Sequence, residues 1–302
     1  MSGILEDFKD AFSKRNNGLV QLIWLNVAVY VLMLIGLIIC KMLNKDFLFE
    51  NSLRYVSLVP ALPTIIFRPW TILSYSFFHA VNPIEHLLPN MLMLYWFGTI
   101  IQEFIGSRRL VNLYILGAFS GGLLAIIAYN FIPYFNNGIQ TATIIGASGS
   151  VMAIVFAAAT LVPDYTFFIF LIGPVRIKYI AFFFFLVSLA SMAGLNAGGG
   201  IVHLGGALLG YLYIKQLQAG RDFGAPIDHT IEFVQRIFKK QEKPQIKVVY
   251  RQKEAGYTPK PVSNGFPDED EVDEILDKIS KSGYESLTKE EKQKLFKASQ
   301  KQ

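Results

Sequence analysis

Apolar stretches separated by short polar segments dominate residues 19–217 of the chain. A helix that crosses the ~30 Å hydrocarbon core of a bilayer needs about 20 predominantly apolar residues. Six stretches reach or approach that length, near residues 19–41, 86–105, 110–133, 148–163, 178–194 and 201–217. The pattern therefore predicts six membrane-spanning helices. The limits of the fifth are the least defined, because the apolar segment 166–175 before it is broken by Gly173 and Pro174 and could lie at the interface instead.

The charges of the short loops orient these helices. With a cytoplasmic N-terminus, the loops on the inner side hold the basic residues Lys14, Arg15, Arg108, Arg109, Arg176 and Lys178, and the lysine-rich tail follows on the same side. The short loops on the other side, near 134–145 and 195–200, contain no charged residue. This asymmetry is the positive-inside pattern, so we expect both termini in the cytoplasm.

After Lys215 the chain becomes polar. The basic amphipathic stretch PIDHTIEFVQRIFKK (226–240) could lie on an anionic inner leaflet or form a solvated surface helix, and a linker with Pro and Gly follows over about 243–267. Helical spacing then recurs at Val272, Ile275, Leu276 and Ile279. Thr288 and Glu291 form the pattern of a capping box, which predicts a second helix and hence a small cytoplasmic helical hairpin.

The composition agrees with a membrane protein. The chain is 52% hydrophobic and 17% charged, against roughly 25% charged residues in soluble proteins. Its net charge of +5 is small for 302 residues and gives no argument for nucleic acid as a partner. We therefore expect an all-α membrane protein, a six-helix transmembrane bundle with a small helical C-terminal extension. We expect a cytoplasmic N-terminal segment over residues 1–18 and the bundle over 19–217. A basic segment with a linker follows over 218–267, and a small helical hairpin over 268–302.

Four polar side chains fall at the same ends of three predicted helices. Ser148 opens the fourth stretch, His203 lies near the start of the sixth, and His86 and Asn90 open the second. These stretches run in one direction, from outside to inside, so the four side chains are expected at one depth. Residues 148–163 cover about 24 Å at ~1.5 Å per residue, less than the hydrocarbon core. Ser148 should therefore lie below the outer surface, on the floor of a protein-lined cavity.

Ser148 and His203 can form a nucleophile and its base. A serine hydroxyl is a weak nucleophile until a base takes its proton, and His203 can do so if the fourth and sixth helices touch. Glycines that permit close backbone approach flank both residues: Gly146, Gly149, Gly206 and Gly210. For either feature alone, the ordinary explanation is helix packing or a serine bonded to its own i−4 carbonyl.

His86 and Asn90 are four residues apart and share a helix face. Acyl transfer needs donors aimed at the developing oxyanion, and an imidazole N–H, an amide N–H and the backbone N–H of Ser148 would serve. Alone, the two residues are better explained as an interfacial cap and a satisfied interhelical hydrogen bond. With no carboxylate in the spans near His203, we expect a Ser-His dyad whose imidazole is positioned by packing. No ligand set at this depth fits a metal, and we expect no cofactor.

Three motifs in this order resemble the rhomboid family of intramembrane serine proteases in its common bacterial six-span form. They are H-x-x-x-N at His86 and Asn90, G-A-S-G around Ser148, and H-L-G-G-A-L-L-G from His203. The resemblance covers about residues 19–217. It implies the same catalytic pair and the same oxyanion donors that the chemistry of the residues suggests.

Other segments agree with the family or depart from it. EFIGSRR (103–109) is similar to the family's short cytoplasmic turn, and Pro69 and Trp70 also match. Members often have arginine where this chain has Thr71, and HAVNPIEH (79–86) is longer than the usual interval between its two histidines. We expect the first of these histidines to be structural.

The resemblance implies endopeptidase action on single-span or multi-span membrane proteins, near the outer end of a transmembrane segment. It also implies a multi-pass protein of a bacterial cytoplasmic membrane, with the lipid bilayer as its surroundings. Phe182 to Phe185 make the fifth helix a candidate lateral gate for substrates.

Two other classes of function compete with a protease. One is a catalytically silent rhomboid-like protein that binds transmembrane clients, although such relatives typically lack a member of the dyad. The other is a small transporter, which would usually need charges at the midplane or paired broken helices. The sequence contains neither feature.

Overall fold

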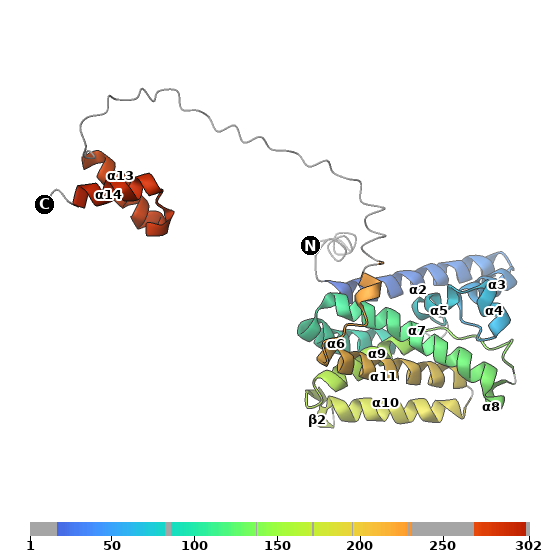
Figure 1. Ribbon diagram of the computed structural model, residues 1–302. Helices are drawn as coiled ribbons and strands as arrows, with labels where there is room; N and C mark the ends of the chain where they lie inside the picture. Colours follow the sequence, from blue (N-terminus) through green and yellow to red (C-terminus); the bar gives the residue numbers. More distant parts are fainter. Residues whose placement is uncertain are drawn as a thin grey trace. The chain divides into compact units, whose positions relative to one another are not determined.

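The computed structural model describes residues 17–81, 86–136, 138–170, 172–194, 196–228, 230 and 269–299. The chain divides into two compact units, Met1–Lys240 and Gln241–Gln302. Long helices that run roughly parallel build the first unit (Figure 1). They are α2 (Gly18–Met42), α6 (Leu87–Ile105), α7 (Ser107–Phe131), α9 (Ser148–Leu161), α10 (Ile177–Met192) and α11 (Ala197–Gln218). Each predicted apolar stretch thus forms a helix, with limits that differ by up to four residues.

Three helices of the described chain, α2, α7 and α11, combine the length and the apolar composition needed to cross a membrane. Helices α9 and α10 are also apolar but have only 14 and 16 residues. At ~1.5 Å per residue, α9 covers about 21 Å, which is less than a ~30 Å hydrocarbon core. A helix this short has to begin below the membrane surface if it ends at the opposite one.

Helix α9 is the core of the bundle. Apolar and small side chains cover it on every side, and its residues from Gly149 to Val155 are all buried. Helix α11 packs directly against it, because β-carbons at Gly206 and Gly210 would collide with the carbonyl oxygens of Gly149 and Ala153. The predicted close approach of the fourth and sixth helices is therefore confirmed.

The segment between α2 and α6 has more regular structure than the apolar pattern alone indicates. It contains the short helices α3 (Asp46–Val56), α4 (Leu62–Phe67), α5 (Thr71–Ser74) and η1 (Tyr75–Phe77). Together with α8 (Pro133–Asn136), they gather at one end of the bundle (Figure 1). An antiparallel bridge between Leu58 and Ile144 ties this loop to the segment that precedes α9.

The apolar segment before the fifth helix folds as a β-hairpin. Strands β1 (Thr166–Ile169) and β2 (Gly173–Arg176) pair antiparallel, at the end of the bundle opposite α3 to α5 (Figure 1). Gly173 has a φ of 94°, which only glycine adopts without strain. The hairpin excludes this segment from the fifth helix, which begins at Ile177.

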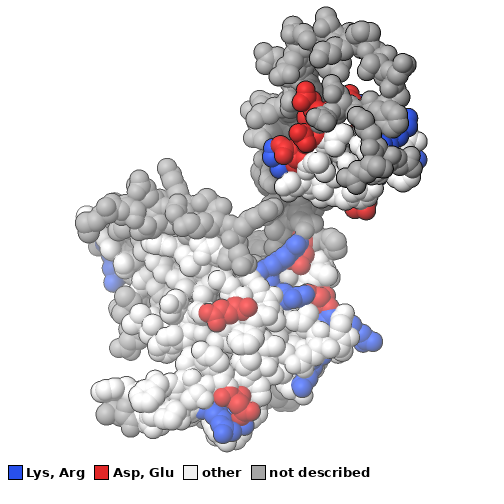
Figure 2. All heavy atoms as spheres, turned by 90° about the vertical axis from the view of Figure 1, so that its left-hand side faces the viewer, with Lys and Arg blue, Asp and Glu red and all other residues white. Residues whose placement is uncertain are grey.

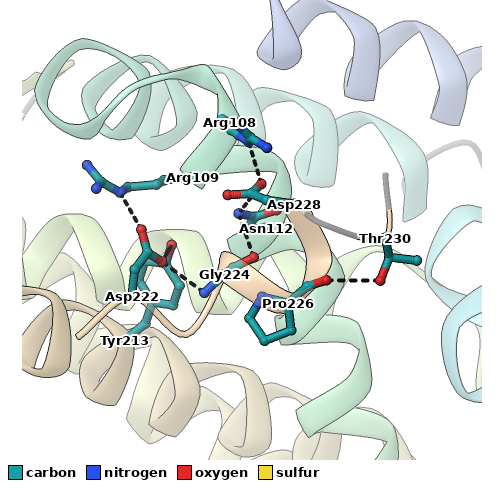
Figure 3. A network of polar contacts seen from close by, with 9 residues as sticks. All are labelled: Arg108, Arg109, Asn112, Tyr213, Asp222, Gly224, Pro226, Asp228 and Thr230. Carbon is teal, nitrogen blue, oxygen red and sulfur yellow. Dashed lines mark hydrogen bonds and ion pairs between the residues drawn. The ribbon is translucent and has the colours of Figure 1, made fainter. Parts of the chain in front are cut away.

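Ion pairs fasten the chain after α11 to the beginning of α7. Arg109 Nε donates to Asp222 at 2.8 Å, and Arg108 pairs with Asp228 at 2.6 Å (Figure 3). Figure 2 looks at this end of the bundle, where the charged side chains of the described residues form separate patches among uncharged ones.

Asp222 is the centre of this network. Its carboxylate accepts from Arg109, from the backbone N–H of Gly224 at 2.8 Å and from the Tyr213 hydroxyl at 3.0 Å. Partial burial alone would raise the pKa of Asp222, but these hydrogen bonds outweigh it and hold the pKa below its usual range. These hydrogen bonds therefore favour the ionised form of the aspartate, the form that pairs with Arg109.

The second unit contains α13 (Glu269–Ser282), η3 (Tyr284–Ser286) and α14 (Lys289–Ser299). The predicted capping box is confirmed, because the Thr288 N–H donates to Glu291 at 2.7 Å and the Glu291 N–H to Thr288 Oγ at 3.3 Å. The segment 1–16, most of the basic stretch 226–240 and the linker 243–267 lie outside the described residues.

Candidate active site

A cavity of about 650 Å³ opens among α6, α9, α10 and α11. Residues 141–146, which lead into α9, also line it, as do Tyr75 and Tyr129. The four side chains singled out in the sequence all line it: His86, Asn90, Ser148 and His203. Residues separated by more than 100 positions in the chain thus meet at one site, at the depth where α9 begins.

Ser148 is the first residue of α9 and is half-buried. The backbone before it enters the protein without helical bonds, as predicted, and finds partners there. Gly146 N–H donates to the Tyr75 carbonyl at 3.0 Å, and Ala147 N–H donates to His79 Nε2 at 3.3 Å. His79 is fully buried and holds the turn that presents Ser148, which agrees with the expected structural role.

Gly146 is required by both conformation and space. Its φ of 130° is a backbone conformation that side chains rarely tolerate. A β-carbon there would lie 2.9 Å from His86 Nε2 and 3.8 Å from Ser148 Oγ. Both side chains therefore border the small space that this glycine leaves open.

His86 is held in one tautomer by a backbone group. Its Nδ1 accepts from the Ala80 N–H at 3.3 Å, so a neutral ring carries its proton on Nε2. Nε2 is the atom that borders the space beside Ser148. Asn90 is buried, and one of its amide protons goes to the His86 carbonyl at 2.7 Å, which leaves a second proton for the cavity.

Three kinds of donor can therefore converge beside the Ser148 hydroxyl: the His86 Nε2–H, the Asn90 amide and the N-terminal N–H groups of α9. The first N–H groups of a helix have no acceptor within it, and its dipole is positive at this end. Such a set can stabilise an oxyanion. The described residues hold no group of three or more His, Cys, Asp or Glu side chains suited to a metal.

His203 lies one turn before Gly206 on α11 and is half-buried in the cavity wall. Its hydrogen-bond partner among the described residues is Ser188 of α10, with 3.3 Å between Ser188 Oγ and His203 Nδ1. Among the hydrogen bonds of the described residues, none joins His203 to Ser148. In proteins without substrate, the bond between nucleophile and base is often long and tightens on binding.

Ser188 is the site residue that the sequence did not reveal. The sequence predicts a histidine positioned by packing, whereas the structure adds a hydroxyl partner from another helix. The only signal is the first of two serines in the run FFFFLVSLAS, and a serine there usually bonds its own helix.

The architecture and the site together define a class: a helical membrane protein with a serine and a histidine facing one intramembrane cavity. Residues 67–218 match the family described as Rhomboid domain, and residues 267–301 match a family of unknown function, DUF6576. The first match covers half of the 302-residue chain. The chain belongs to the rhomboid family.

Similarity to curated proteins is moderate. The chain is 28% identical over 163 residues to RHOMBOID-like protein 12, mitochondrial, of Arabidopsis thaliana, covering 51% of this chain and 48% of that protein. It is 27% identical over 183 residues to the presenilin-associated rhomboid-like protein, mitochondrial, of Rattus norvegicus, covering 55% and 42%. The chain thus spans less than half the length of these relatives, and their names place them in mitochondria and not in bacteria.

Proposed function

We propose that this protein is an intramembrane serine endopeptidase with Ser148 as nucleophile and His203 as base. One observation carries the proposal: Ser148, His203, His86 and Asn90 line a single cavity in a chain of the rhomboid family. Close packing of α11 on α9 through Gly206 and Gly210 supports it further.

The proposed reaction is acyl transfer in two stages. Ser148 Oγ attacks a peptide carbonyl while His203 Nε2 accepts the hydroxyl proton, and the oxyanion receives hydrogen bonds from His86, Asn90 and the Ser148 N–H. The His203 imidazolium then protonates the leaving amine as the C–N bond breaks. Water, deprotonated by His203, hydrolyses the acyl-enzyme and restores the serine.

The proposed substrates are transmembrane segments of other membrane proteins, cut near their outer ends. Ser148 begins a helix too short to cross the bilayer, so the scissile bond must lie near that depth. A carbonyl inside a stable helix is shielded by its own hydrogen bond, which favours segments with small or helix-breaking residues at the cut. Helix α10, with exposed Phe182 and Phe183, borders the cavity and is the candidate lateral gate.

We also propose the six-span topology with both termini in the cytoplasm, and a bacterial cytoplasmic membrane as its location. Arg108, Arg109, Arg176 and Lys178 belong to the start of α7, to β2 and to α10, which share one end of the bundle (Figure 1). That end is the inner one under the positive-inside rule. In this topology the bundle extends over 19–217, and the segments 1–18, 218–267 and 268–302 are cytoplasmic.

A client-binding protein without catalysis is the second candidate. The observation in its favour is that Ser148 and His203 share a cavity without a hydrogen bond between them. Such a protein would hold transmembrane segments at the same cavity and leave them intact.

The test is cleavage of a transmembrane reporter by the full chain in liposomes. The reporter carries small residues near the outer end of its span. We expect wild type to cleave it and Ser148→Ala to bind it without cleavage. Ser150→Ala is the matched control, because Ser150 lies on the same helix, fully buried and outside the cavity wall. Equal cleavage by wild type and Ser148→Ala would contradict the proposal, and reporter binding with no cleavage by either would favour the client-binding protein.

A further inference from the structure

Ser188 is a buried polar side chain that the proposed dyad does not use. It lies on α10 with 2% of its surface exposed. Its Oγ is 2.7 Å from the Phe184 carbonyl oxygen of its own helix and 3.3 Å from His203 Nδ1 on α11. Together, these two contacts determine which ring nitrogen of His203 carries the proton.

The hydroxyl has one proton and can donate only once. A carbonyl oxygen has no proton, so the contact with Phe184 is a donation by Ser188. Towards His203 the hydroxyl can then act only as an acceptor, and Nδ1 must be the donor. A neutral imidazole with its proton on Nδ1 has its lone pair on Nε2, which is the form a general base requires.

We propose that Ser188 is a positioning residue that fixes His203 as the Nδ1-protonated tautomer, with Nε2 ready to accept the Ser148 proton. The proposal rests on the proposed protease function. Ser188 fills the place that a carboxylate has in a Ser-His-Asp triad, but as a neutral acceptor. Among the described residues, the other titratable groups that line the cavity are His86, Tyr75 and Tyr129, and no Lys, Arg, Asp or Glu of this part of the chain lines it.

The contact also joins two helices. His203 belongs to α11, whereas Ser188 belongs to α10, whose outer face exposes Phe182 and Phe183 at the edge of the bundle (Figure 1). Displacement of α10 away from α11 would remove the acceptor from Nδ1. The position of α10 therefore sets the state of the proposed base.

The first test compares Ser188→Ala with two matched variants in the reporter assay. Loss of one neutral hydrogen bond should lower kcat roughly 3- to 10-fold with KM unchanged. The acidic limb of the pH–rate profile should move to lower pH, because the imidazolium loses an acceptor. Ser188→Thr should keep kcat and the acidic limb close to those of wild type, because threonine has a hydroxyl that can bond the i−4 carbonyl. Ser191→Ala removes the same kind of i−4 bond, to Val187, and should change neither.

The second readout does not depend on activity. In the Ser148→Ala protein with ¹⁵N-labelled histidine, NMR should show the His203 proton on Nδ1, and Ser188→Ala should redistribute it between the two nitrogens. An unchanged kcat and acidic limb in Ser188→Ala, or a His203 proton on Nε2, would overturn this proposal alone. Loss of activity in Ser188→Ala with an unchanged acidic limb would reduce Ser188 to a structural role. Persistent cleavage by Ser148→Ala would instead overturn the protease mechanism itself.

Discussion

The two walls of the cavity hold their histidines in opposite ways. On the α6 side, a backbone N–H from Ala80 occupies His86 Nδ1 and leaves a proton on Nε2. On the α11 side, the Ser188 hydroxyl accepts from His203 Nδ1 and leaves Nε2 without one. The same side chain becomes a donor on one wall and an acceptor on the other, and the group at Nδ1 decides which. Removal of either ring should reduce cleavage most, and a shift of the helices that hold the rings should reduce it less.

His203→Ala removes the proposed base and should have the larger effect. General base catalysis contributes about 10²- to 10⁴-fold, so kcat for the reporter should fall by that factor. Reporter binding should remain, because the cavity is not closed by the change. Quantitative cleavage kinetics with the purified full chain give the result, and a loss below tenfold would exclude His203 as the base.

His86→Ala removes one proposed oxyanion donor and should have a smaller effect. Loss of such a donor costs roughly 10²- to 10³-fold in kcat, since it acts in the transition state and not in substrate binding. KM should therefore stay close to that of wild type. A raised KM with kcat intact would show that His86 contributes to binding and is not an oxyanion donor.

Gly206→Ala should act on the α11 wall through helix packing. The added methyl would meet the Gly149 carbonyl, so α11 has to move away from the beginning of α9. Overpacking of this kind costs about 1–3 kcal/mol, measurable as a lower thermal midpoint in detergent, together with reduced cleavage. Gly36→Ala on α2 is the control, because no atom lies within 4 Å of that position. Equal midpoints for the two variants would contradict the close contact.

The sequence predicted the helices and the cavity residues well, for a physical reason. Hydrophobic length located the long helices that the structure describes in the first unit, and one helix direction put Ser148, His203, His86 and Asn90 at one depth. Their catalytic roles remain predictions. The glycine ridge also predicted correctly which helices touch.

The features that the sequence did not predict depend on backbone and side-chain partners that an apolar pattern does not define. The structure of the segment between α2 and α6 rests on contacts such as the Leu58–Ile144 bridge, which join segments far apart in sequence. The hairpin β1–β2 was not predicted because its residues are as apolar as those of a helix. Ser188 was not predicted as the partner of His203, because this contact depends on which face α10 turns towards α11. A run of phenylalanines does not define that face.

The most direct test of the central claim is the site of covalent labelling by a serine-directed phosphonate. The full chain in liposomes is treated with the probe, digested, and mapped by mass spectrometry. The account predicts one adduct on Ser148 that forms far more slowly in His203→Ala. An adduct on Ser188, or cleavage of the reporter by a protein that is never labelled at Ser148, would contradict it.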